Sequence, residues 1–173
     1  MPELNRLTIE EFKAAEKLPV VIVLDNIRSQ NNIGSIFRTA DAFRLQGVYL
    51  CGITATPPHR EIHKTALGAT ESVDWQYYTS TLEAIKSLHQ QGYFILTVEQ
   101  VEGSILLPDF RPIVGNKIAI IFGNEVNGID DDVLTYATAS VEIPQYGTKH
   151  SINVSVAVGI VIWDLFIKMN VLK

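Results

Sequence analysis

The sequence predicts an α/β fold in which a parallel β-sheet is covered by helices on both faces. Short apolar runs rich in valine and isoleucine alternate along the chain with segments whose apolar residues recur at helical spacing. Most of these runs are continuously apolar, which is typical of strands buried on both faces. A chain of 173 residues suggests one domain with room for a hydrophobic core.

The first predicted unit is a strand, a helix and a second strand. The run "LPVVIVLDNI" at residues 18–27 is interpreted as a buried strand, and "GVYLCGI" at 47–53 as the next one. Residues 32–43 between them predict a helix, because their apolar residues repeat every three or four positions and share one face. Cys51 lies inside the second apolar run and is expected to be buried and inert.

The middle of the chain continues this alternation. Residues 59–68 indicate a short helix, with Gly68 placed to end it, and 72–78 indicate a third strand. Residues 80–92 start with Ser and Thr, carry Glu83 in the first turn and stop at a glycine. These are the end features of a helix.

The last third of the chain predicts three more strands, at 93–100, 117–123 and 139–144, and a short helix at 129–137. The final segment, 154–167, is apolar on almost every side, which predicts a helix buried on all sides. Because a small chain has difficulty covering such a helix alone, this indicates a dimer. A central core helix within a monomer is the alternative.

Composition limits the class of protein. Hydrophobic residues make up 47% and charged residues 19%, as in globular proteins, and the net charge of -5 argues against non-specific coating of nucleic acid. The single cysteine excludes an intrachain disulfide and a cysteine-based zinc site. The start has no signal-peptide pattern, and the apolar run 154–167 is shorter than the roughly 20 residues of a membrane span. We therefore expect a cytoplasmic protein without a membrane segment, with residues 1–17 as a short N-terminal extension.

Several common ligand motifs are missing from the sequence. No two of the 11 glycines are spaced as Gly-x-Gly, so the dinucleotide turn, the glycine-rich turn of ordinary methyltransferases and the P-loop are excluded. There is no Gly-x-Ser-x-Gly elbow either. The histidines do not form a metal-binding set, and we expect no metal. Three polar loops remain, each at the end of a predicted strand, where α/β sheets bind ligands.

The first loop is "DNIRSQNNIGSIFRTADAF", residues 25–43. Asn31 and Asn32 lie at a helix start, where exposed amides can hold an anion or a ribose, although one of them is expected to cap the helix instead. Arg28 and Arg38 flank the same turn. Two arginines there favour an anion or RNA site over ordinary solvated charges.

The other two loops carry polar residues in similar places. In "IIFGNEVNGID", residues 120–130, Glu125 follows a buried strand directly, although Asn-Gly is also an ordinary turn pair. In "IPQYGTKHSINVSV", residues 143–156, Ser151 and Asn153 precede the apolar helix, which they could simply cap.

Together, these loops resemble the three motifs of the SpoU-type, or TrmH-like, RNA 2′-O-ribose methyltransferases of the SPOUT superfamily. The motifs read "NNIGSIFRTADAF", "FGNEVNG" and "IPQYGTKHSINVSVAVGI", and "KTALGA" at 64–69 also resembles the family. They occur in the family's order and spacing, and the match covers nearly the whole chain from about residue 18. The set is very specific, whereas any one motif alone is weak.

The resemblance implies a parallel-sheet α/β SPOUT domain, residues 18–173, whose C-terminal segment forms a deep trefoil knot. It also implies S-adenosylmethionine as cofactor, held by the knot loops, and a homodimer. The expected activity is methylation of a ribose 2′-hydroxyl in RNA, in tRNA first and in rRNA as the other possibility. The polar third loop would then wrap the cofactor, and the apolar helix would be buried in the knot and the dimer.

The resemblance also assigns site residues. The positions that match the polar active-site set are Asn32, Arg38, Glu125, Ser151 and Asn153. The positions that match the cofactor contacts, largely through the backbone, are Thr97, Val98, Gly123, Ile143 and Ile152.

Arg38 matches the residue proposed to activate the ribose hydroxyl. A guanidinium stays protonated in proteins and is therefore a poor base. We therefore expect Arg38 to stabilise the developing alkoxide or the neighbouring phosphate. Asn124 and Glu125 are expected to shape the loops.

The chain departs from the family pattern at Arg44, where a glycine is frequent, at Gln145, where a methionine is frequent, and mildly at Ile152. The acidic chain is expected to bind RNA through a local basic patch, which salt would weaken. The residues expected in this patch are Arg28, Arg38, Arg44 and Lys149. Two alternatives stay open: a non-catalytic RNA-binding protein that retains the fold, and a small-molecule-binding α/β protein unrelated to methyl transfer.

Overall fold

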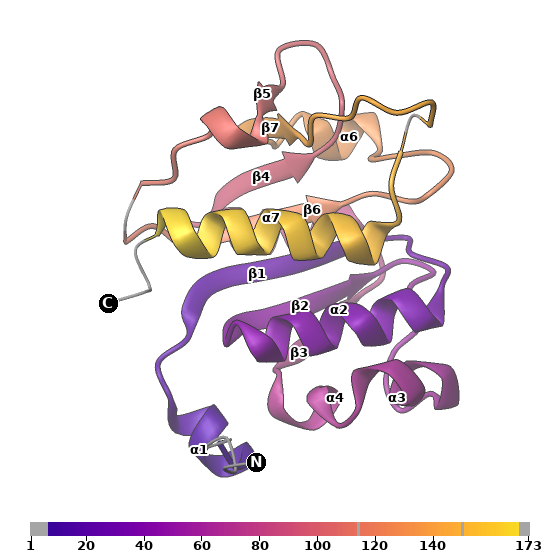
Figure 1. The fold of residues 1–173 in the computed structure, drawn as a ribbon, viewed down its shortest axis with the longest axis vertical. Coiled ribbons are helices and arrows are strands. Elements are labelled where there is room, and N and C mark those ends of the chain that lie inside the picture. Colours follow the sequence, from indigo (N-terminus) through magenta and orange to yellow (C-terminus); the bar gives the residue numbers. More distant parts are fainter. Residues whose placement is uncertain (1–6, 114, 150, 170–173) are drawn as a thin grey trace.

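The computed structural model describes residues 7–113, 115–149 and 151–169 (Figure 1). Seven parallel strands form one sheet in the order β3-β2-β1-β6-β4-β7-β5. The predicted parallel α/β sheet is therefore confirmed. The strands are β1 (Leu18–Asp25), β2 (Leu45–Cys51), β3 (Trp75–Tyr78), β4 (Phe94–Val98), β5 (Ile105–Leu106), β6 (Ile118–Phe122) and β7 (Ala139–Glu142).

The helices cover both faces of this sheet. They are α1 (Ile9–Ala14), α2 (Gln30–Ala42), α3 (Arg60–Ala66), α4 (Ala69–Ser72), α5 (Thr81–Gln90), the 3-10 turn η1 (Leu107–Asp109), α6 (Asp131–Leu134) and α7 (Val154–Lys168). The predicted helices at 32–43, 59–68, 80–92, 129–137 and 154–167 are confirmed, with shifted ends. The sequence did not predict α1, α4, η1 or the two-residue strand β5.

The region after α3 differs from its prediction. The helix ends at Ala66, because Leu67 adopts the left-handed conformation, with φ of 50°. Gly68, with φ of 90°, then starts α4 rather than ending α3. As α4 extends to Ser72, the strand predicted from residue 72 begins only at Trp75.

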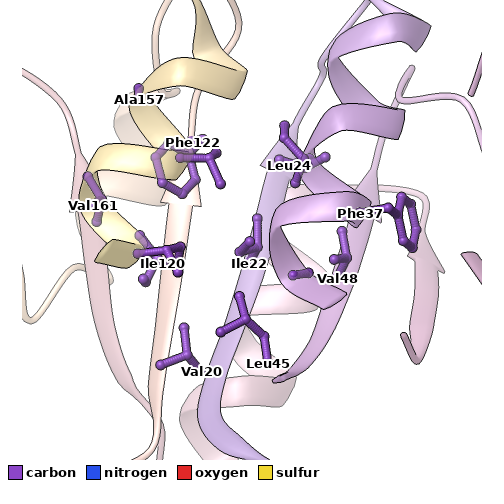
Figure 2. Close-up of a cluster of buried hydrophobic side chains, with 14 of the residues drawn as sticks. Val20, Ile22, Leu24, Phe37, Leu45, Val48, Ile120, Phe122, Ala157 and Val161 are labelled. Carbon is purple, nitrogen blue, oxygen red and sulfur yellow. The ribbon is translucent and has the colours of Figure 1, made fainter. Parts of the chain in front are cut away.

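Strand residues alternate between two cores. Val20, Ile22 and Leu24 of β1 point toward the core that contains α2 and α7, whereas Val21 and Val23 point toward α5 and α6. In Figure 1, α7 and α2 lie side by side over the same face of the sheet. Figure 2 shows the first core, with α7 over β6 and α2 over β1 and β2. Because every strand of the sheet centre is covered on both sides, the continuous apolar runs of the sequence are explained.

Cys51 belongs to the second core and is wholly buried. Burial raises the pKa of its thiol to about 12, so little thiolate forms at neutral pH. The expected burial of Cys51 is confirmed, and its raised pKa supports the expectation that the thiol is inert.

Within this chain the apolar helix α7 is buried on one face only, so the alternative of a central core helix in a monomer is wrong, and burial of the other face by a partner subunit stays a prediction. Its inner face packs into the core, but its outer face is exposed. This outer face, called the α7 stripe below, consists of Val156, Ile160, Trp163 and Ile167. The helix is shorter than a membrane span, and in the described ranges we find no helix with the length and hydropathy to cross a bilayer.

Asp25 is the last residue of β1, and only 1% of it is exposed. Its carboxyl group lies on the face of the sheet that carries the second core. Burial raises its pKa above the ordinary 3.8; hydrogen bonds from Thr81 and Asn26 oppose this shift, and the negative charge of Asp130 adds to it. The stability contributed by the neutral carboxyl group is therefore complete below the ordinary pKa and is lost as pH rises through the raised one.

We expect an Asp25→Asn protein to gain stability relative to the wild type as pH rises from about 4 to about 8, because only the wild type must then hold a buried charge. Urea unfolding of both proteins at several pH values measures this difference. A difference independent of pH would show that the folded and unfolded states share one pKa at Asp25.

Candidate active site

A hollow with a partly polar lining lies at the carboxyl edge of the sheet, and we call it the central cavity. It has a volume of about 510 Å³ and is formed by the ends of β4, β6 and β7 and the start of α7. A volume of this size suits a small-molecule ligand. Its position agrees with the edge where parallel α/β sheets bind ligands.

Four of the five predicted cofactor-binding residues line the central cavity: Val98, Gly123, Ile143 and Ile152. They come from three different connections, which the fold brings together. Thr97 does not line it. Its side chain is wholly buried, and its hydroxyl lies 2.7 Å from the hydroxyl of Ser140 on the neighbouring strand β7.

Three of the five predicted catalytic residues, Glu125, Ser151 and Asn153, also line the cavity. Asn32 is joined to this group, because the side-chain amide of Asn153 donates a hydrogen bond of 3.1 Å to its Oδ1 atom. The contact links the start of α2 with the start of α7, which are 121 residues apart in sequence. The first and third predicted loops therefore meet at one site.

Arg38 is not brought to the central cavity. It lies on α2 six residues after Asn32, about 9 Å further along the helix axis, and its side chain is exposed. It is absent from the described cavity lining and makes no hydrogen bond to another described residue. Within one chain, the predicted catalytic set is therefore divided between the cavity and the outer face of α2.

The structure shows which residues cap α2 and α7, a question that the sequence left open. Ser29 caps α2 by accepting a hydrogen bond from the backbone N–H of Asn32, so neither Asn31 nor Asn32 is the cap. Asn153 does cap α7, because its Oδ1 accepts from the N–H of Ser155 at 2.9 Å. Its amide nitrogen stays available for Asn32, so Asn153 serves both the helix and the site.

Asn124 is the centre of the second loop and is 8% exposed. Its Oδ1 atom accepts hydrogen bonds from the backbone of Val126, at 2.8 Å, and of Asn127, at 3.2 Å. Its amide nitrogen donates a 2.7 Å hydrogen bond to the carbonyl of Asn26 at the end of β1. One buried side chain thus shapes the turn after β6 and fastens it to the first loop.

The same turn is tightened by two glycines and one carboxylate. A Cβ atom at Gly123 would lie 2.5 Å from the carbonyl carbon of Gly128, so only glycine fits. Gly128 has φ of 70° and packs against the carboxylate of Glu99, whose Oε2 accepts from the N–H of Ile129 at 3.3 Å. Glu99 lines the cavity and was not predicted, although an acidic residue directly after the strand "FILTV" was visible in the sequence.

The central cavity is acidic. Glu99, Glu125 and Glu142 line it, and its described lining contains no lysine, arginine or histidine. This charge arrangement favours a ligand that carries positive charge. The same charge arrangement disfavours an anionic group such as a phosphate inside the cavity.

The basic patch expected from the sequence is not gathered in one place. The carbonyl of Arg44 accepts from the N–H of Leu18, the first residue of β1, so Arg44 lies at the amino edge of the sheet. Arg28 lies at the opposite, carboxyl edge, in the connection between β1 and α2. The inclusion of Arg44 in the patch is thus wrong, because α2 carries the chain back across the sheet.

Fold, cavity and motifs together define a parallel α/β protein whose candidate ligand site lies between loops at the carboxyl edge of the sheet. The model of the SpoU rRNA Methylase family matches residues 19–163, and the chain belongs to this family. The family expected from the motifs is confirmed.

Two relatives illustrate the similarity in sequence. The tRNA (guanosine(18)-2'-O)-methyltransferase of Borreliella burgdorferi is 31% identical over 151 residues, which cover 87% of this chain and 67% of that protein. A protein of Staphylococcus saprophyticus, named for the TrmH family of tRNA/rRNA methyltransferases, is 29% identical over 163 residues. These cover 94% of this chain but 64% of the relative, so the chain spans just under two thirds of that protein's length.

Two solved structures share the fold. The AdoMet-bound rRNA methyltransferase from Sinorhizobium meliloti superposes with a TM-score of 0.79 at 24% identity, over 88% of this chain and 58% of that one. The TrmH/SpoU tRNA modifying enzyme of A. aeolicus superposes with a TM-score of 0.80 at 21% identity. The match covers 92% of this chain and 79% of that one. The SPOUT type of parallel α/β fold is confirmed by these likenesses.

Proposed function

We propose that the protein is an S-adenosylmethionine-dependent methyltransferase that modifies a ribose 2′-hydroxyl in RNA, with tRNA as the first candidate and rRNA as the second. The observation that carries the proposal is the central cavity, where loops from three distant parts of the chain meet with their motif residues. The names of the family and of the B. burgdorferi relative support methyl transfer to RNA. We expect the protein to act in the cytoplasm, where such RNAs are used.

The residues of the central cavity fit this cofactor. Its volume is sufficient, and Gly123, which has no side chain, and Ile143 both line its wall. The carboxylates of Glu99, Glu125 and Glu142 suit a positively charged ligand. When bound, S-adenosylmethionine supplies a methyl group on a cationic sulfur. Val98, Gly123, Ile143 and Ile152 would hold it in the cavity, with Thr97 supporting the wall from behind.

The polar residues would orient the acceptor ribose. The hydrogen bond between Asn153 and Asn32 fixes two amide groups at the cavity rim, next to Ser151. Fixed groups of this kind align the reacting atoms and contribute by orientation. The cationic guanidinium of Arg38 would stabilise the negative charge that develops on the 2′-oxygen as its proton leaves. Glu125, exposed at the rim, would shape the entrance.

Methyl transfer is tested with methyl-labelled S-adenosylmethionine and either unfractionated tRNA or rRNA, followed by digestion and mass spectrometry of the nucleosides. We expect label in a 2′-O-methyl nucleoside, and a loss of about a hundredfold or more in Arg38→Ala, in the range found when one charge-stabilising group is removed. Arg38→Lys is expected to recover little, because the planar fork is lost. Bound cofactor with no labelled RNA would instead favour a non-catalytic RNA-binding protein.

We also propose a homodimer that covers the α7 stripe. Four large apolar side chains on one exposed helix face are unusual for a monomer. Trp163 is half exposed, and its ring packs against that of Phe43, the residue that follows α2. Helix α2, which carries the exposed Arg38, covers the same face of the sheet as α7 and packs against it (Figure 1). A two-fold contact there would bring Arg38 into the interface, where it can serve the partner's cavity.

A Trp163→Glu protein is expected to dimerise about thirtyfold more weakly than the wild type, because a buried aromatic residue is the usual anchor of an interface. Light scattering across a concentration series measures this. Ile113→Glu is the matched control, because Ile113 is an apolar residue that is 66% exposed and lies outside the α7 stripe. This substitution should leave the dimerisation constant unchanged. A wild-type protein that stays monomeric at all concentrations would contradict the proposed dimer.

The C-terminal trefoil knot also belongs to the proposal. It is supported by the path of the last segment, which leaves β7, lines the cavity beside the turn after β6, and then packs α7 against α2. An experimental structure whose backbone contains no knot would contradict this proposal.

A further inference from the structure

A second hollow adjoins the central cavity, and we call it the outer hollow. It has a volume of about 390 Å³ and shares four lining residues with the central cavity: Gln100, Glu142, Ile143 and Gln145. The two hollows therefore adjoin along the segment that follows β7. A polymer whose reacting nucleotide reaches the central cavity must have neighbouring nucleotides close to this rim.

The remaining walls of the outer hollow have an unusual composition. They consist of Leu106, Pro144, Tyr146, Gly147 and Lys149. Tyr146 is 96% exposed, and its hydroxyl makes no hydrogen bond to another described residue. Leu106 is 41% exposed and supplies a second apolar surface. A ring held in water next to an aliphatic surface, a cation and two amide side chains is the set of groups that recognises unpaired nucleotides.

We propose that Tyr146 stacks on the base of a nucleotide that flanks the methylated ribose, with Lys149 contacting the adjoining phosphate. The inference rests on the proposed function and adds a substrate-binding residue to it. The acidic central cavity cannot attract the RNA backbone, so a cation just outside it is needed for that contact. Because every base offers a flat face, the stack contributes affinity for RNA rather than choice of base.

The test is steady-state methyl transfer to unfractionated tRNA and, in parallel, to rRNA, at saturating methyl donor. We expect Tyr146→Ala to raise the KM for RNA about tenfold and to leave kcat within about twofold, as for the loss of one stacked base. Tyr146→Phe keeps the ring and should behave like the wild type. Lys149→Ala should raise KM less and make it less dependent on salt. Calorimetry should find unchanged binding of S-adenosylmethionine in all three proteins.

Tyr136→Ala, at an exposed tyrosine outside both hollows, is the matched control and should have no effect on KM. An unchanged KM in Tyr146→Ala, with an active wild type, would overturn the inference and leave the proposed function intact. Equal defects in Tyr146→Ala and Tyr146→Phe would overturn stacking in favour of the hydroxyl. If light scattering found a different oligomeric state for Tyr146→Ala than for the wild type, the ring would belong to a subunit interface instead. A wild type that methylates neither RNA would overturn the proposed function, and this inference with it.

Discussion

An Asn124→Ala protein is expected to lose measurable binding of S-adenosylmethionine and, with it, methyl transfer. The substitution removes three hydrogen bonds of a buried amide: those to the backbone of Val126 and Asn127, and the 2.7 Å bond to the carbonyl of Asn26. Without them the turn after β6 is no longer fastened to the first loop. We expect the free energy of unfolding to fall by about 3 kcal/mol, since each lost bond costs about 1 kcal/mol.

Two further substitutions separate the two roles of this amide. Asn127→Ala is the matched control, because Asn127 lies in the same turn and contributes only its backbone N–H to Asn124. It should bind the cofactor normally. Asn124→Asp keeps the acceptor for Val126 but loses the donor to Asn26, so it should retain part of the stability and little of the binding. Calorimetry and urea unfolding give both quantities, and normal cofactor binding by Asn124→Ala would show that this side chain does not shape the site.

Long elements of the fold could be predicted because their burial is uniform. All but one residue of β1 are buried, so the continuous apolar run at 18–27 was sufficient evidence of a central strand. The two residues of β5 are both exposed at the sheet edge, and their pairing with Val141 and Glu142 leaves no pattern in the sequence. Helix α4 has only four residues, too few for a helical repeat.

Helix α1 was different, because its capping box was readable. The side chain of Thr8 accepts from the N–H of Glu11, and the Glu11 carboxylate accepts from the N–H of Thr8. This Thr-x-x-Glu pattern is a helix start by the same rule that predicted the helix at 80–92. The charged composition of the first 17 residues concealed it.

The site residues could be predicted where the position of the backbone alone brings them to the cavity. They could not be predicted where the direction of the side chain determines whether it reaches the cavity. Gly123, Ile143 and Ile152 follow strands or precede α7, so their meeting at one edge follows from parallel topology. Arg38 belongs to the same motif as Asn32, and Arg44 directly follows it, yet Arg38 lies on the outer face of α2 and Arg44 at the opposite sheet edge. A contiguous motif on a helix is spread along its axis, and only the packed structure shows which members reach the cavity.

A Gly34→Ala protein is expected to lose about 3 kcal/mol or more of stability, at the upper end of overpacking costs. Gly34 lies in the contact between α2 and α3. An added Cβ atom would be 2.0 Å from the Oγ1 atom of Thr65, 2.3 Å from the carbonyl oxygen of Ile62 and 3.0 Å from the backbone nitrogen of Ala66. Two of these three atoms are backbone, so the helices must separate. This explains the glycine of the "NNIG" sequence by packing rather than by contact with a ligand.

A second substitution distinguishes the sources of this cost. Thr65→Ala removes the closest atom but leaves the Ile62 carbonyl, so the Gly34→Ala, Thr65→Ala double variant should regain only part of the loss. Ser35→Ala, at the next residue of the same helix, should cost about 0.5 kcal/mol or less, because its side chain bonds only to the carbonyl of Asn31. Since Asn32 lies half a turn from Gly34, separation of the helices also moves its amide away from Asn153. The free energy of unfolding, measured in urea, and the rate of methyl transfer should therefore both fall in Gly34→Ala. A stable variant with normal activity would show that α2 and α3 can separate without moving the site.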